Sequence, residues 1–187
     1  MLVLVQGHPM IIQPNDLWRW SYDAQSDRLM LDLSDHMLFA TEYRGKQLVP
    51  AAFTSCAFCV DDAALYYSLL DQAQALDWSA PAKVQLILNA VAVRRFYKPL
   101  MPQSWYFREY DQSYPSTAGA LVIMECEGRE ALFMVVEEGE YASVCINLEQ
   151  ELMLAGHKSF PRFAVIKVMN NRLRGWEAPE ISLAQAG

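Results

Sequence analysis

The sequence is short of cationic side chains and of long apolar runs. Its 15 Lys and Arg residues stand against 22 Asp and Glu residues, which gives a formal net charge of −7 over 187 residues. An acidic chain repels phosphate backbones, so we expect no general binding to nucleic acid. No window approaches the roughly 18 uninterrupted apolar residues that a transmembrane helix needs. We therefore expect no membrane insertion.

Cysteine and histidine are also scarce. The four cysteines are too few for a disulfide framework, and no Lys or Arg precedes Arg19, so the basic region of a signal peptide is missing. Both features favour a cytoplasmic protein. The three histidines lie far apart, at His8, His36 and His157. They lack the spacing of metal ligands, so we predict no metal site and no cofactor.

Familiar catalytic motifs are missing as well. The sequence contains no G-x-S-x-G, P-loop or G-x-G-x-x-G pattern. Asp61 and Asp62 are explained by a helix N-terminus, where carboxylates accept backbone N–H groups. We predict no catalytic residues and conclude that the chain is not an enzyme. A small-molecule-binding protein or uncharacterised enzyme, with a pocket walled by the Trp-rich N-terminal strands, is the alternative.

One C-x-x-C motif is present, Cys56-Ala57-Phe58-Cys59. It suits a redox pair or half of a zinc site, but Cys126 and Cys145 have no nearby histidine to complete zinc coordination. Because Ala57 and Phe58 are core-like and a free cysteine behaves as a small hydrophobe, packing is the favoured interpretation. A thiol-redox protein stays open as a further alternative.

The composition, 53% hydrophobic and 12% aromatic, is sufficient for a globular core. Period-2 alternation over 17–39 predicts a small antiparallel meander, with a turn over 23–27. Asp61 and Asp62 are expected to cap a helix that runs to about Leu76. Ser79 is expected to cap a second helix, which Pro99 ends. This second helix is apolar nearly all round from Val84 to Val93, so it should be buried.

The pattern then returns to strands, expected over 105–109, 120–126, 131–137, 141–148 and 151–155, with turns at Glu127-Gly128 and Gly139. Pro161 is expected to open a final helix that reaches Leu173, with Gly175 as its cap and the last dozen residues as an extended tail. The order predicts an α+β fold. An N-terminal α/β lobe, the meander plus helices, spans 11–104. A C-terminal twisted antiparallel β lobe with one helix spans 105–187.

A basic cluster stands out from the acidic background. Arg94, Arg95 and Lys98 lie near the end of the buried helix, beside Tyr97 and Met101. Cations at a helix C-terminus favour the macrodipole, by about 0.3–1 kcal/mol each. Three of them could instead form a basic pocket for an acidic partner. The residues alone leave both interpretations open.

Several stretches, in order from about Ile11 to the end, are similar to one known family. They are Trp18-Arg19-Trp20, Met30-Leu31-Asp32-Leu33, Phe58-Cys59-Val60-Asp61-Asp62-Ala63-Ala64-Leu65-Tyr66, the run from Lys98-Pro99-Leu100-Met101 to Pro102-Gln103-Ser104-Trp105, the helix expected over 166–173, and Ile181-Ser182-Leu183. The Val-Asp-Asp-Ala-Ala-Leu and Lys-Pro-x-Met-Pro-x-Ser-Trp segments are the most specific. On these residues the chain resembles ZapC, a family of proteobacterial division proteins.

This resemblance implies a cytoplasmic protein at the mid-cell division ring, monomeric or weakly self-associating, without chemistry of its own. Its expected partner is the FtsZ polymer, whose protofilaments it would bundle laterally while slowing GTP turnover. FtsZ contact in the family is associated with an apolar pocket and a basic surface. On matching positions Leu31 would belong to the pocket, and Arg95 and Lys98 would supply charge. With Arg94 and Met101 these residues form the candidate FtsZ-binding set.

Overall fold

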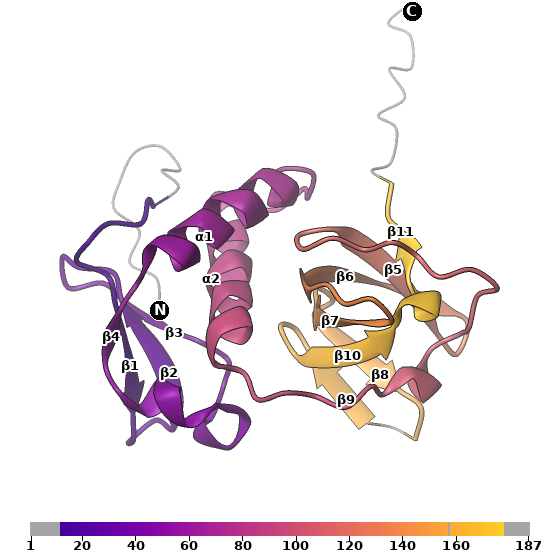
Figure 1. Cartoon of the computed structure of the whole chain (residues 1–187), viewed down its shortest axis with the longest axis horizontal. Coiled ribbons are helices and arrows are strands. Elements are labelled where there is room, and N and C mark those ends of the chain that lie inside the picture. The colour runs from indigo at the N-terminus through magenta and orange to yellow at the C-terminus, as the bar shows by residue number, and fades with distance from the viewer. Residues whose placement is uncertain (1–11, 157, 178–187) are drawn as a thin grey trace, which may run out of the picture.

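The computed structural model describes residues 12–156 and 158–177, which form two lobes joined by the segment that follows the second helix (Figure 1). The N-terminal lobe has an antiparallel sheet in the order β3-β2-β1-β4. Two helices follow it in sequence. The elements are β1 (Arg19–Asp23), β2 (Arg28–Asp32), β3 (Leu38–Ala40), β4 (Cys56–Ala57), α1 (Val60–Ala73) and α2 (Ala80–Phe96). The predicted α+β class is confirmed.

The predicted meander is confirmed, and the sequence shows why it forms. Trp20 and Leu31 lie opposite each other on β1 and β2, and both are fully buried. The turn between these strands is held by the Asp23 carboxylate, which accepts the backbone N–H groups of Gln25 and Ser26 at 3.2 and 3.1 Å. Alternating burial on the strands and a side chain that satisfies the turn backbone therefore fix the register.

Helix α1 begins differently from the prediction. Its N-cap is Cys59, and the expected caps Asp61 and Asp62 lie inside the first turn. Asp62 still satisfies the helix start, because its Oδ2 accepts the Cys59 backbone N–H at 3.0 Å. The helix ends at Ala73, short of the predicted Leu76. A carboxylate at the third helical position thus performs the function that we assigned to the cap position.

Helix α2 is buried on all sides over 86–93, as its composition predicts. Ser79 is its N-cap residue, Pro81 lies in its first turn, and Ile87, Leu88 and Ala90 are fully buried. Figure 1 shows α1 and α2 between the N-terminal sheet on the left and the C-terminal sheet on the right. The core that contains α2 also includes C-terminal side chains, namely Leu121, Met134, Val136, Ile146, Leu148, Phe163 and Val165. The two lobes therefore share one apolar core.

The C-terminal lobe is an antiparallel sheet in the order β10-β7-β6-β5-β11, with a separate hairpin β8-β9. Its strands are β5 (Leu121–Cys126), β6 (Arg129–Glu137), β7 (Ala142–Asn147), β8 (Glu151–Leu154), β9 (Lys158–Pro161), β10 (Val165–Met169) and β11 (Arg174–Gly175). Four predicted strands correspond to β5, β6, β7 and β8. Glu127 and Gly128 both have positive φ, 50° and 75°, as expected for a two-residue hairpin turn.

Two predictions for this lobe are wrong. The strand expected over 105–109 is replaced by a 3₁₀ turn, Ser104–Tyr106, and an irregular segment. The final helix expected from Pro161 to Leu173 is strand β10 followed by the 3₁₀ turn Asn170–Arg172, so the similar stretch over 166–173 is not helical either. Gly175 pairs with Val122 in the sheet and caps no helix. Val165 belongs to the shared core, whereas Ile166 and Val168 belong to a second core within the lobe.

That burial on both faces explains the wrong helix prediction, because a strand covered on both sides loses its period-2 alternation. The tail expected over the last dozen residues lies largely outside the described residues, and so do residues 1–10. Within 12–156 and 158–177, neither helix combines the length and the apolar character needed to cross a bilayer.

Because both lobes pack on α2, a cavity in this helix should weaken both of them. We expect Ile87→Ala to lower the free energy of unfolding by about 3 kcal/mol and to speed hydrogen exchange in β2 and β7 alike. Val60→Ala is the control, since Val60 is 84% exposed. Exchange followed by mass spectrometry checks this, and protection retained in one lobe alone would contradict the shared core.

Candidate functional site

Arg95 and Asp62 form an ion pair at the junction of four elements. The Arg95 guanidinium, on the last turn of α2, binds Asp62 Oδ2 through Nη1 and also donates to the Ala57 carbonyl at 3.0 Å. Asp62 Oδ2 accepts two more hydrogen bonds, from Trp20 Nε1 at 3.2 Å and from the Cys59 backbone N–H at 3.0 Å. The Asp62 side chain is 6% exposed. We call these contacts the Arg95–Asp62 clamp, because they tie α2 to β1, β4 and α1.

The C-x-x-C motif lies at this clamp. Arg95 Nη2 is 3.4 Å from Cys56 Sγ, and Nη1 is 3.6 Å from Cys59 Sγ. Both cysteines are free and half-buried. The guanidinium carbon also lies 5.0 Å from the centroid of the Phe96 ring. The structure thus places one shared cation beside the two sulfur atoms that the sequence analysis attributed to packing.

Arg94 turns the other way, toward the C-terminal lobe. Its Nη1 lies 3.2 Å from Glu137 Oε2, with both side chains about half exposed at 52% and 50%. Glu137 follows an irregularity in the pairing of β6 with β7, at Val135–Glu137. Bulges of this kind redirect side chains. Lys98, just beyond α2, donates from Nζ to the Lys46 carbonyl at 2.8 Å.

A small cleft of about 150 Å³ opens between the lobes at this end of α2. Its lining brings three cations, Arg94, Lys98 and Lys167, together with one carboxylate, Glu137. The other lining residues are Val93, Tyr97, Pro99, Leu100 and Val144. We call it the cationic cleft. Lys167 was missing from the candidate set, because it falls in the segment 161–173 that we expected to be a helix. As the central residue of β10, it belongs to the site through the sheet.

Tyr97 adds a neutral polar group to the cleft. Burial raises the pKa of its phenol, although the hydrogen bond from Gln47 partly offsets this effect. The phenol therefore keeps its proton at neutral pH. Because the hydroxyl oxygen accepts from Gln47 Nε2 at 2.8 Å, its own O–H can donate to a ligand. The cleft accordingly offers cationic and neutral donors suited to a carboxylate or another oxyanion.

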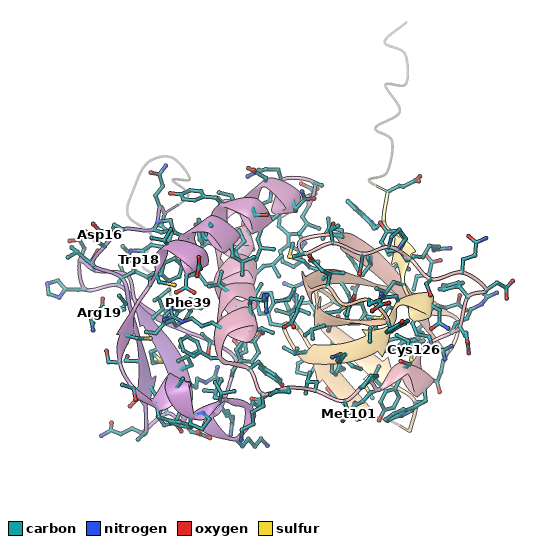
Figure 2. The ribbon with its side chains drawn as sticks, viewed as in Figure 1. Asp16, Trp18, Arg19, Phe39, Met101 and Cys126 are labelled. Atoms are coloured by element: carbon teal, nitrogen blue, oxygen red, sulfur yellow. The ribbon has the colours of Figure 1, made fainter. Side chains whose placement is uncertain are left out.

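The predicted site residues do not all meet. Arg94 and Lys98 both line the cationic cleft, and Met101, 81% exposed, follows the cleft residue Leu100. Met101 is labelled on the segment that leads out of α2 (Figure 2). Arg95 is held in the clamp. Leu31 is fully buried, opposite Trp20 and Phe39 in the sheet, and presents no surface to a partner.

Another cleft, of about 260 Å³, lies beside β3 and bears on the small-molecule alternative. Its residues are Arg28, Leu38, Phe39, Ala40, Glu42, Gln85, Asn89 and Phe163. Its polar groups bind one another, since Arg28 pairs with Glu42 at 3.0 Å and Asn89 Oδ1 accepts the Glu42 N–H. Trp18 and Trp20 are buried in the core and line neither this cleft nor the cationic cleft (Figure 2 labels Trp18). Among the described residues, no three His, Cys, Asp or Glu side chains come together as metal ligands.

Comparison with known families covers nearly the whole chain. The model for the N-terminal part of cell-division protein ZapC matches residues 11–98, and the model for its C-terminal part matches 99–178. The two matches meet between Lys98 and Pro99, at the cationic cleft. The boundary that we predicted near residue 104 lies slightly later in the segment that joins the lobes.

Individual relatives give the same result. The Cell division protein ZapC of Aeromonas hydrophila is 61% identical over 164 residues, which is 88% of this chain and 92% of the relative. That of Musicola paradisiaca is 41% identical over 167 residues, covering 88% and 89%. That of Photobacterium profundum is 37% identical over 179 residues, covering 95% and 100%.

The two neighbouring arginines should differ in their effect on stability. Arg95→Ala leaves the buried Asp62 carboxylate without its cation, so we expect a loss of about 3 kcal/mol. Arg94→Ala breaks a half-exposed pair and should cost less than about 1 kcal/mol. Urea unfolding of both variants measures the difference. Equal losses would mean that the clamp does not stabilise the fold.

Proposed function

The chain belongs to the ZapC family of cell-division proteins, and from this we propose that it binds FtsZ polymers directly and promotes the lateral association of their protofilaments. It acts in the cytoplasm, at the mid-cell division ring. It works as a binding protein, without a catalytic step or a cofactor. Stabilising lateral contacts would hold the ring together and slow GTP turnover by FtsZ.

The cationic cleft is the observation that carries this proposal. The chain has a net charge of −7, yet Arg94, Lys98 and Lys167 gather around one opening. FtsZ is an acidic partner in the family context, and two acidic proteins associate through local charge complementarity. The cleft is the natural place for a carboxylate side chain of FtsZ to enter.

The contacts inside the cleft allow a partner carboxylate to take the place of Glu137. The Arg94–Glu137 pair is half exposed, so its net contribution to stability is small and a partner carboxylate can replace Glu137 at little cost. Within the described part of the chain, Lys98 is bound to a backbone carbonyl and to no carboxylate, so its charge is not neutralised there. Leu100 and the exposed Met101 extend the cleft with apolar surface.

Arg95 and Leu31 take supporting functions in this proposal. Arg95 is a positioning residue that fixes the end of α2 through the clamp. Leu31, on β2, fills part of the N-terminal core. Changes at either position would disturb FtsZ binding through the shape of the lobe, without loss of a direct contact.

Bundling requires each bound molecule to connect two filaments. Either the protein has a second FtsZ-binding surface, or it self-associates once it is bound. On a polymer every further contact is effectively intramolecular, so weak individual contacts are sufficient. A monomer, or a weakly self-associating protein, can therefore bundle.

The test is right-angle light scattering of the matched FtsZ with GTP, with and without this protein, followed by pelleting. We expect scattering to rise and the protein to enter the pellet. If scattering did not rise and the protein stayed out of the pellet, the FtsZ proposal would be refuted. The cleft beside β3 would then become the candidate ligand site.

Charge reversal in the cleft should abolish this binding. We expect Lys98→Glu with Lys167→Glu to remove the protein from the FtsZ pellet, because the partner carboxylate then meets negative charge. The wild-type interaction should also weaken above physiological salt, as the screening length falls from about 8 Å at 0.15 M toward about 3 Å at 1 M.

Arg129→Glu with Lys158→Glu is the matched control. These two cations are exposed and lie outside the cleft, in β6 and β9. The control carries the same charge change, so it should pellet like the wild type. If a folded Lys98/Lys167 variant still pelleted, the cleft would not be the binding surface.

A further inference from the structure

The four cysteines fall into two pairs with different surroundings. Cys126 and Cys145 are buried in the C-terminal lobe, with exposures of 1% and 0%. Burial raises the pKa of both thiols, that of Cys145 to about 12. Cys56 and Cys59 are half-buried and lie beside the Arg95 guanidinium. Reactive cysteines occur in partly exposed, electropositive surroundings, so only the second pair fits that description.

Of these two cysteines, Cys56 contacts the Arg95 nitrogen that has fewer other acceptors. Arg95 Nη1 is divided among Asp62 Oδ2, the Ala57 carbonyl and Cys59 Sγ. Among the described residues, Nη2 has a single acceptor, Cys56 Sγ at 3.4 Å. The contact therefore places a positive charge and a hydrogen-bond donor directly beside the Cys56 sulfur.

We propose that Cys56 is a thiol-modification site that forms a mixed disulfide with an oxidised low-molecular-weight thiol. The Cys56 thiolate attacks one sulfur of the small disulfide. The new S–S bond forms as the old one breaks, and the other half leaves as a thiolate that takes a proton from water. The reaction consumes one disulfide and releases one thiol, so no further oxidant is required.

The local backbone favours a mixed disulfide over an internal Cys56–Cys59 bond. Cys56 and Ala57 form β4 along β1, where Cys56 pairs with Trp20. The chain stays extended to Cys59, and the Phe58 N–H donates to the Trp18 carbonyl at 2.9 Å. Three extended residues span about 10 Å, whereas a disulfide requires Cα atoms within about 7 Å. Closing the internal bond would therefore require this strand to leave the sheet.

Modification would act on the Arg95–Asp62 clamp. Glutathione carries two carboxylates, and a Cys56 adduct holds them beside Arg95, where they compete with Asp62. Asp62 is buried, so losing its cation is costly. The adduct should therefore loosen the junction of β1, β4, α1 and α2. Modification of Cys56 does not depend on whether FtsZ is the partner of this protein.

The experiment treats the native full-length chain with oxidised glutathione and follows it by intact mass and peptide mapping. We expect one glutathione on Cys56 and none on Cys126 or Cys145, which serve as internal controls. Cys56→Ser should lose the adduct, while Cys59→Ser should keep it. The adduct should lower the thermal midpoint by about 5 °C, and a reducing agent should restore it.

Other outcomes would overturn the proposal. They are no adduct on the native protein, an adduct that persists in folded Cys56→Ser protein, or an internal disulfide in place of the adduct. An unchanged thermal midpoint in the fully modified protein would overturn the link to the clamp. Melting of unmodified Cys56→Ser shows whether that variant is folded, so a missing adduct there is interpretable.

Discussion

The double burial of α2 is the constraint from which most of this structure follows. A helix that packs against a sheet on each side can carry few polar groups, and those few must bind one another. Asn89 meets this requirement, because its amide donates to the Gln85 carbonyl and accepts the Glu42 N–H. Charged residues are then confined to the ends of the helix, Lys83 near its start and Arg94 and Arg95 in its last turn. The basic cluster lies there, at the negative end of the macrodipole, so both interpretations of the cluster from sequence can hold together.

Successive residues on a helix point about 100° apart, and this separates the two arginines of α2. Arg95 faces the N-terminal lobe and is bound by Asp62, whereas Arg94 faces the C-terminal lobe and Glu137. A cluster that is continuous in sequence is therefore divided between a structural ion pair and an accessible cleft. Arg95 does not line the cleft, whereas Lys167, which comes from the opposite lobe, does. The candidate site is thus a product of how the lobes pack.

Local patterns in the sequence were sufficient to predict the meander, both helices and the hairpin turn at Glu127-Gly128, because alternation, helix caps and turn residues decide those elements locally. The helix predicted up to Leu173 failed for a tertiary reason. Val165 enters the shared core while Ile166 enters the second one, and a strand buried on both faces resembles a helix in its apolar pattern. The same error removed Lys167 from the candidate site. The resemblance placed Leu31 in an apolar pocket and Arg95 on a basic surface, whereas the burial of Leu31 and the binding of Arg95 to Asp62 depend on packing that the sequence does not display.

The clamp and the cationic cleft are coupled through the backbone just after α2. The Phe96 carbonyl accepts the Val49 N–H at 2.9 Å, and the Lys98 N–H donates to the Gln47 carbonyl at 2.8 Å. These bonds hold the chain beyond α2 against 46–49, while Arg95 anchors the last turn of the helix. If modification of Cys56 releases Arg95, the bonds to 46–49 still keep Lys98 in place. Loosening the clamp should therefore lower the stability of the N-terminal lobe first, and it should alter the cleft only where the end of α2 moves.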